Sequence, residues 1–193
     1  MRKISVTFML LVLAFVKMDA QVEYHHGFGA GLHIFEPKDD PANSGGVSGY
    51  TATYQARLNV ANVGSNMSVG VMANPAGGFS GNSRTGGSFL YDLPIYAVGN
   101  FGYFANKDSD SGIGVYAGAG FQFWGFGASG VSGTGSNPAA ILGVRFNISD
   151  KPLDISGSYG FRSDATVLVL RLTYMFGSSD DRNDMGGKTR RRK

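Results

Sequence analysis

From Val22 onward, apolar and polar residues alternate with a period of two, and this alternation constrains the fold more than any other feature. In residues 50–60 the even positions are apolar or aromatic, and the odd positions are polar. A period of two places the two sets on opposite faces of an extended strand, whereas helical spacing would mix them. The sequence therefore predicts β-strands.

The alternation recurs in eight segments. They cover residues 22–35, 50–60, 67–73, 89–97, 113–123, 140–148, 153–161 and 168–176. Tilted strands of about ten residues cross a bilayer, and bacterial outer-membrane barrels use an even number of antiparallel strands. The predicted fold is all-β, an eight-stranded antiparallel up-and-down transmembrane β-barrel.

The predicted connections alternate in length. The first, third and fifth, at residues 36–47, 74–87 and 127–138, are long and rich in Gly, Asn, Ser and Pro. The second, fourth and sixth, at residues 61–66, 105–112 and 149–152, are shorter. Outer-membrane barrels have short periplasmic turns and longer outer loops, so this asymmetry indicates such a barrel. Only the seventh connection, residues 163–165, is short where the rule predicts a long one.

A soluble β-barrel would show the same alternation with its apolar face turned inward. The apolar face here holds small residues such as Ala52, Ala56 and Ala117, which would fill a soluble core poorly. Charged residues make up only 16% of the chain, and the polar face has few lysines and glutamates for a solvated exterior. Aromatic residues also gather near the strand ends, as in membrane girdles. These features favour a barrel with lipid outside.

The first twenty residues are predicted to be a signal peptide. Arg2 and Lys3 precede an apolar run from Ile4 to Val16, and Asp19-Ala20-Gln21 follows as a small-residue cleavage site. This run is shorter than the about 20 residues of a transmembrane helix. We expect residues 1–20 to direct export and to be cleaved, residues 21–176 to form the barrel, and residues 177–193 to form a disordered, basic periplasmic tail.

The formal charge of +3 is unevenly distributed along the chain. Residues 21–176 hold eight basic and ten acidic residues, so the barrel has no basic excess for nucleic acid. The basic run Arg190–Lys193 lies in the tail, where an exported protein does not meet nucleic acid. Expected contacts are instead outer-membrane lipid and lipopolysaccharide, the barrel-insertion machinery, and a periplasmic partner of the tail.

One stretch of about thirty residues resembles a known family. Phe89-Leu-Tyr-Asp-Leu-Pro-Ile-Tyr96, Gly-Asn-Phe-Gly102 and Gly114-Val-Tyr-Ala-Gly-Ala-Gly-Phe121 are similar to the porin-like outer-membrane β-barrel domain, of the small OmpA/OmpX type. The resemblance implies an eight-stranded barrel in the bacterial outer membrane and, for most members, no assigned chemistry. The chain departs from the pattern because it continues past its final aromatic residue and has Arg171 where glycine is common.

Charged residues on the polar face are the candidate site. An eight-stranded barrel is just wide enough to be filled by side chains, and charges in such a space must pair. We expect a structural ionic network that plugs the lumen. Its predicted members are Glu23, Arg57, Asp92, Arg145, Asp154, Arg162 and Arg171.

No pattern predicts an enzyme, a cofactor or a metal site. His25 and His33 share the polar face of the first strand, and no neighbouring serine completes a nucleophile–base pair in the sequence. The segment from Asn106 to Gly112 resembles a calcium loop but has Ser111 and Ala117 where an EF-hand needs Gly and Glu. The cysteine-free chain also excludes thiol chemistry. The predicted function is a non-enzymatic structural or interaction protein; a narrow porin and a barrel hydrolase remain as alternatives.

Overall fold

In a computed structural model, the described part of the chain consists of β-strands and their turns. The described residues are 22–37, 47–82, 86–106, 109, 112–128, 131–148, 151–162 and 165–177. The predicted signal peptide and the tail beyond residue 177 lie outside these ranges. Within them, no helix has the length and apolar character needed to cross a membrane.

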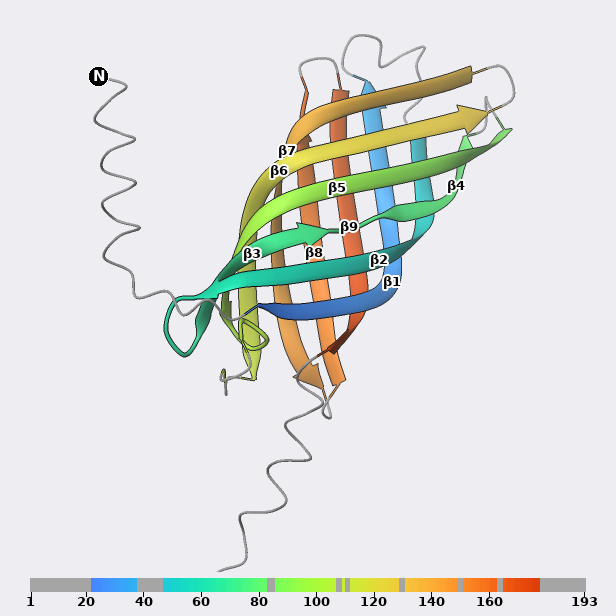
Figure 1. Ribbon diagram of the computed structural model, residues 1–193. Coiled ribbons are helices and arrows are strands. Elements are labelled where there is room, and N and C mark those ends of the chain that lie inside the picture. Colours follow the sequence, from blue (N-terminus) through green and yellow to red (C-terminus); the bar gives the residue numbers. More distant parts are fainter. Residues whose placement is uncertain are drawn as a thin grey trace, which may run out of the picture.

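The strands form one closed antiparallel sheet (Figure 1). Strands that follow one another in the sequence pair with each other, except β3 and β4, and β1 also pairs with β9, which closes the ring. We name the end with the start of β1 and the finish of β9 the proximal end, and the opposite end the distal end. The strands are β1 (Glu23–Pro37), β2 (Val47–Asn62), β3 (Met67–Ala73), β4 (Ala76–Asn82), β5 (Gly86–Gly102), β6 (Ile113–Ala128), β7 (Val131–Ile148), β8 (Lys151–Phe161) and β9 (Ala165–Gly177).

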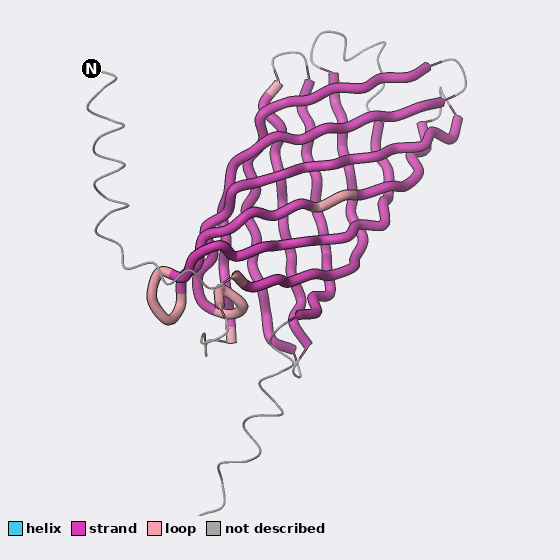
Figure 2. The backbone as a smooth tube through the Cα atoms, viewed as in Figure 1, coloured by secondary structure: helices cyan, strands magenta, loops and turns pink. Residues whose placement is uncertain are grey.

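β3 and β4 together occupy a single position in the barrel. Both pair with β2 on one side and with β5 on the other. The break between them at Asn74 and Pro75 is visible as a short interruption in the strand tube (Figure 2). Proline has no N–H for a strand ladder, yet the Tyr54 N–H still donates to the Pro75 carbonyl at 2.9 Å. The ring thus has eight strand positions, and the predicted eight-stranded up-and-down barrel is confirmed.

Strand register shows how the barrel closes. Successive paired residues can be followed from Ala30 around the ring in both directions. One path ends on β7 at Val144, through Leu172 and Ile155. The other ends on β7 at Thr134, through Ala52, Gly77, Tyr91 and Gly125. The two end points differ by ten residues along β7, and this offset is the stagger with which tilted strands close into a barrel.

The prediction of long loops at residues 74–87 and 127–138 is wrong. β4 occupies half of the first segment and β5 begins within it at Gly86, while β7 begins at Val131, which pairs with Ala128 at the end of β6. In the second segment Gly133 and Gly135 belong to β7, where they make room for inward aromatic rings. A Cβ added at Gly133 would lie 2.8 Å from the Phe126 ring, and one at Gly135 would lie 2.7 Å from the Trp124 ring.

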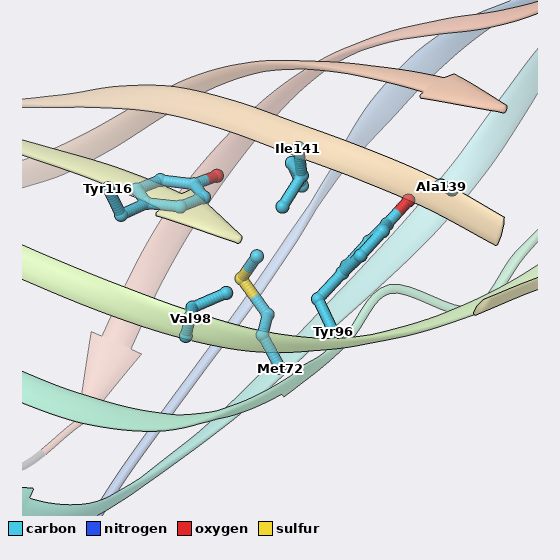
Figure 3. Packing of buried hydrophobic residues seen from close by; sticks show 6 residues of the cluster. All are labelled: Met72, Tyr96, Val98, Tyr116, Ala139 and Ile141. Carbon is cyan, nitrogen blue, oxygen red and sulfur yellow. The ribbon is translucent and has the colours of Figure 1, made fainter. Parts of the chain in front are cut away.

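The alternation separates an apolar outer face from a polar interior. Tyr50, Leu142 and Phe28 expose 79%, 64% and 59% of their surface on the outside, while inward residues of the same strands are buried. A soluble barrel would show the opposite arrangement. Part of the interior is apolar, and this cluster packs against one side of the lumen (Figure 3). It comprises Met72, Tyr96, Val98, Tyr116, Ala139 and Ile141.

Candidate functional site

The candidate site is the barrel interior, where alternation brings charged side chains from most of the strands. Arg57, Asp92, Arg145, Asp154 and Arg171 are each at most 2% exposed. Each occupies the inward position between two outward residues of its strand, so the strand period alone forces it into the lumen. Buried charges of this kind are stable only when they are paired and hydrogen-bonded.

One group of side chains joins four strands near the middle of the barrel. Arg171 Nη2 donates to Asp92 Oδ2 at 2.7 Å, and Arg171 Nη1 donates to Ser158 Oγ at 2.9 Å. His33 Nε2 lies 2.9 Å from the same Asp92 oxygen. We call these four residues the Asp92 cluster. Because they come from β1, β5, β8 and β9, their contacts link opposite walls of the lumen.

A second group of side chains lies closer to the proximal end. We call its residues Arg57, Asn100, Tyr116, Arg145 and Asp154 the Arg145 cluster. Arg145 Nε donates to Asp154 Oδ2 at 3.0 Å, and the Tyr116 hydroxyl donates to Asp154 Oδ1 at 2.8 Å. The Arg145 guanidinium also lies 4.1 Å from the centre of the Tyr116 ring. Arg57 and Arg145 both donate to Asn100 Oδ1, each at 3.0 Å. One neutral amide oxygen therefore bridges two buried cations.

The turn after β5 folds into the proximal end of the lumen. We call residues 103–106 the capping segment. The carbonyl of Phe104 accepts a hydrogen bond from Arg57, and the carbonyl of Ala105 accepts hydrogen bonds from Ser68 and, at 2.7 Å, from Asn59 Nδ2. Phe104 and Ala105 are 4% and 0% exposed. Inward side chains of β2 and β3 thus hold the main chain of the capping segment in place.

The backbone of the capping segment is unusual. Phe104 has a φ of 61°, which is in the left-handed region that bulky residues rarely adopt. The Phe104 ring packs against the ring of His25 with 5.1 Å between centroids. Asn106 Nδ2 donates to the Gly64 carbonyl at 3.1 Å and so ties the segment to the neighbouring turn. Together these contacts hold the capping segment in a backbone conformation that the isolated chain would disfavour.

The predicted site residues have different surroundings in the structure. Asp92 lies with Arg171, and Asp154 with Arg145. Glu23 instead lies 3.5 Å from His25 and accepts a hydrogen bond from Asn62 at 3.4 Å. Arg57 binds Asn100 and the capping segment, and the guanidinium of Arg162 stacks 5.0 Å from the Trp124 ring.

Sequence reasoning missed three contributors to this site. Asn100 and Tyr116 stand at inward positions of their strands, and the continued alternation past residue 97 would have indicated Asn100. The sequence predicts only a shorter connection at residues 105–112, which overlaps the capping segment at its last two residues. No sequence signal marks it, because the side chains that bind its carbonyls come from β2 and β3.

The fold also brings a hydroxyl to a histidine, which the sequence did not indicate. Thr51 Oγ1 lies 3.3 Å from His33 Nδ1, and His33 Nε2 contacts Asp92. A hydroxyl, an imidazole and a carboxylate in this order are the elements of a hydrolase triad. Here all three residues are at most 5% exposed, and Arg171 binds the same carboxylate oxygen. The arrangement is therefore enclosed within the lumen packing.

The described residues contain no group of three or more His, Cys, Asp or Glu side chains that could hold a metal ion. His26 points outward, away from His25 and His33, so the three histidines do not converge.

Comparison with solved structures identifies the same architecture in outer-membrane proteins. Ail, the attachment invasion locus protein of Yersinia pestis, in complex with the heparin analogue sucrose octasulfate, is 17% identical; the match has a TM-score of 0.52 and covers 81% of this chain and 99% of Ail. Neisserial surface protein A is 15% identical, with a TM-score of 0.53 over 80% of this chain and 96% of that protein. No family model and no curated protein sequence matches the chain. The chain has the fold of the small eight-stranded outer-membrane β-barrels.

Proposed function

We propose that this chain is a non-enzymatic protein of the bacterial outer membrane, where its barrel has a structural or interaction role and its lumen is plugged by side chains. An apolar outer face wrapped around buried ion pairs supports this proposal, because the arrangement is stable only with lipid outside. The fold shared with Ail and Neisserial surface protein A supports the same location. In this account residues 1–20 are the cleaved signal peptide.

The proposal places the proximal end in the periplasm. β1 starts at this end and β9 finishes at it. In an outer-membrane barrel with an even number of strands, both termini lie on the periplasmic side. The basic tail would then meet a periplasmic partner, and the barrel-insertion machinery would act on the strands during assembly. The distal loops would face lipopolysaccharide and the cell exterior, where an interaction role is exercised.

One observation supports the plugged lumen most strongly. The capping segment and the Arg145 cluster follow each other along the barrel axis in the proximal half of the lumen. Arg57 connects the two, because it donates to Asn100 and to the Phe104 carbonyl. An eight-stranded barrel leaves little space beyond its own side chains. Together these features oppose free passage of solutes, so the narrow porin is the second candidate.

Single-channel recording in planar bilayers tests this proposal. The purified protein should show negligible conductance. The double variant Arg57→Ala, Asn59→Ala should conduct measurably, because it removes side-chain donors that hold the capping segment. Leu58→Ala is the matched control, since Leu58 lies between them in β2 but faces outward, and it should behave as the unmodified protein.

Each alternative predicts a different result. A large conductance of the unmodified protein would support the porin and contradict the plug. The hydrolase is favoured by the Thr51–His33–Asp92 contacts alone. It would be supported by a change in the mass of lipid A or phospholipids that disappears in Thr51→Val. We expect no such change, because Thr51 is 4% exposed.

A further inference from the structure

The strand break between β3 and β4 is visible in Figure 1, and a groove lies beside it on the outer face of the barrel. The groove is open to the outside and has a volume of about 300 Å³. Its lining consists of the small residues Ala52, Thr53, Pro75, Ala76 and Gly77 and of the rings of Phe28 and Tyr54. Phe28 is 59% exposed, so the groove opens outward rather than into the lumen.

A cluster of aromatic rings leads from this groove toward the proximal end. The Phe28 and Tyr54 rings lie 4.9 Å apart and belong to both the groove and the cluster. The Tyr24 and Tyr54 hydroxyls are 2.6 Å apart. The His26 ring stacks on Tyr24 at 5.4 Å and lies 5.5 Å from Phe176. Groove and cluster are therefore one continuous surface across β9, β1, β2 and β4.

This surface is amphipathic along the strand direction. Its groove end is lined mainly by hydrocarbon, while its proximal end presents two phenol hydroxyls and an imidazole among aromatic rings. Tyrosine and similar rings favour the headgroup level of a bilayer, where one side is apolar and the other is wet. Hydroxyl and imidazole N–H groups can donate to phosphate oxygens. The polarity matches a lipid whose headgroup points toward the periplasm.

The distance between the two ends matches one leaflet. On β1 the groove begins at the lining residue Phe28, four positions after Tyr24, and its far edge is level with Ala30, which is paired with Ala52 and follows Tyr24 by six positions. Six residues span about 20 Å along a strand, which at a tilt of about 45° is roughly 14 Å along the membrane normal. Half of the hydrocarbon core of a bilayer measures about 15 Å. An acyl chain anchored near Tyr24 would therefore end in the groove.

We propose that the surface formed by Tyr24, His26, Phe28, Tyr54, Gly77 and Phe176 is a binding site for one phospholipid of the periplasmic leaflet. The phosphate accepts hydrogen bonds at the Tyr24–His26 end, and the end of one acyl chain occupies the groove beside Pro75. The site rests on the proposed outer-membrane function and adds to it a defined ligand. It is continuous with the rest of the apolar outer face, so the lipid reaches it by lateral diffusion.

Photolabelling tests the site. The full chain is reconstituted in vesicles of phosphatidylethanolamine and phosphatidylglycerol that contain a phospholipid with a diazirine at the end of one acyl chain. Labelled peptides are then mapped by mass spectrometry. We expect labelling to concentrate on the peptides around Ala52 and residues 75–77, above that of Leu142, although Leu142 is the more exposed outer position. Equal labelling around the barrel would overturn the proposal.

A groove-filling variant sharpens the test. A Cβ at Gly77 would first meet the Phe89 ring at 3.7 Å, so Gly77→Leu can fill the groove without a clash at the first carbon. Its affinity for phosphatidylethanolamine, titrated by native mass spectrometry, should fall about tenfold, as expected if roughly two methylene groups lose their contact. The control Gly157→Leu also points outward, with Leu170 Cδ2 at 3.5 Å, and should bind as the unmodified protein.

Failure of the site and failure of the proposed function can be told apart. Heat-modifiable gel migration of the reconstituted protein reports whether a barrel has inserted. Inserted barrel with uniform labelling, or with Gly77→Leu binding unchanged, contradicts the lipid site and leaves the membrane barrel intact. Loss of heat-modifiable migration in the unmodified protein would contradict the membrane function itself.

Discussion

Arg171 Nη2 and Asp92 Oδ2 lie 2.7 Å apart, although 79 residues separate them in the sequence. Both side chains are fully buried. The pair links β9 to β5 through the lumen, with no backbone pairing between these two strands. A charge-assisted hydrogen bond in this position holds opposite walls at a fixed distance.

Asp92→Ala should strongly destabilise the barrel. The change leaves Arg171 buried without its carboxylate, and breaking a buried ion pair typically costs about 3–5 kcal/mol. The unfolding midpoint in urea, measured in detergent micelles by gel migration, checks this. The double variant Asp92→Ala, Arg171→Met should recover part of the loss because it removes the uncompensated charge. Unchanged stability of Asp92→Ala would contradict a structural role for the pair.

Asn100→Leu should cost about 3 kcal/mol of unfolding free energy. The substitution removes the oxygen to which Arg57 and Arg145 both donate, and hydrogen bonds to charged groups contribute about 1.5–3 kcal/mol each. Asn100→Asp retains an acceptor at that place and should unfold close to the midpoint of the unmodified protein. If Asn100→Leu were as stable as Asn100→Asp, the bridging role of this amide would be wrong.

Gly143→Ala should be destabilising by about 1–3 kcal/mol, the usual cost of overpacking. A Cβ at this inward position would lie 2.2 Å from Cζ of the Tyr116 ring, which is 1% exposed and has no room to move. Gly157→Ala is the control, because its Cβ would meet only Leu170 Cδ2 at 3.5 Å, and its effect should stay within about 0.5 kcal/mol. Equal effects of the two substitutions would show that the Tyr116 ring does not fill the lumen as described.

Leu170→Arg should cost about 2–4 kcal/mol in a bilayer, the range for a lipid-facing arginine near the midplane. Leu170 is 47% exposed on the outer face, and its neighbour Arg171 points into the lumen. The comparison is made in phospholipid vesicles, with Leu170→Ala as the control for lost side-chain area. A cost of Leu170→Arg no larger than that of Leu170→Ala would indicate that water rather than lipid surrounds β9.

The period-two pattern was sufficient to assign the faces of most strands. The five charged residues Arg57, Asp92, Arg145, Asp154 and Arg171 all lie inward, because a strand cannot shift by one residue without exchanging its faces. Loop boundaries were predicted less well. Gly133 and Gly135 suggested a loop, yet they lie in β7, where they fit against the Phe126 and Trp124 rings.

Whether a contact within the site could be predicted depends on how far apart its two residues lie in the sequence. Arg145 and Asp154 are paired neighbours on β7 and β8, and a tight turn centred between them would have indicated that register. Asp92 and Arg171 could not be matched from the sequence, because their contact depends on how eight strands close into a ring. The capping segment was equally hidden, since backbone carbonyls of Phe104 and Ala105 act as acceptors whatever their side chains.

Site-directed fluorescence quenching along β2 tests the orientation of the barrel most directly. The chain has no cysteine, so single cysteines at positions 51–59 can be labelled individually with a small fluorophore. The protein is then reconstituted in vesicles that contain phospholipids brominated on the acyl chain. We expect strong quenching at the even positions, including Tyr54 and Leu58, and little at the odd positions, including Gln55 and Arg57. Quenching at the odd positions, with even positions reached by aqueous iodide, would contradict an apolar face turned to lipid.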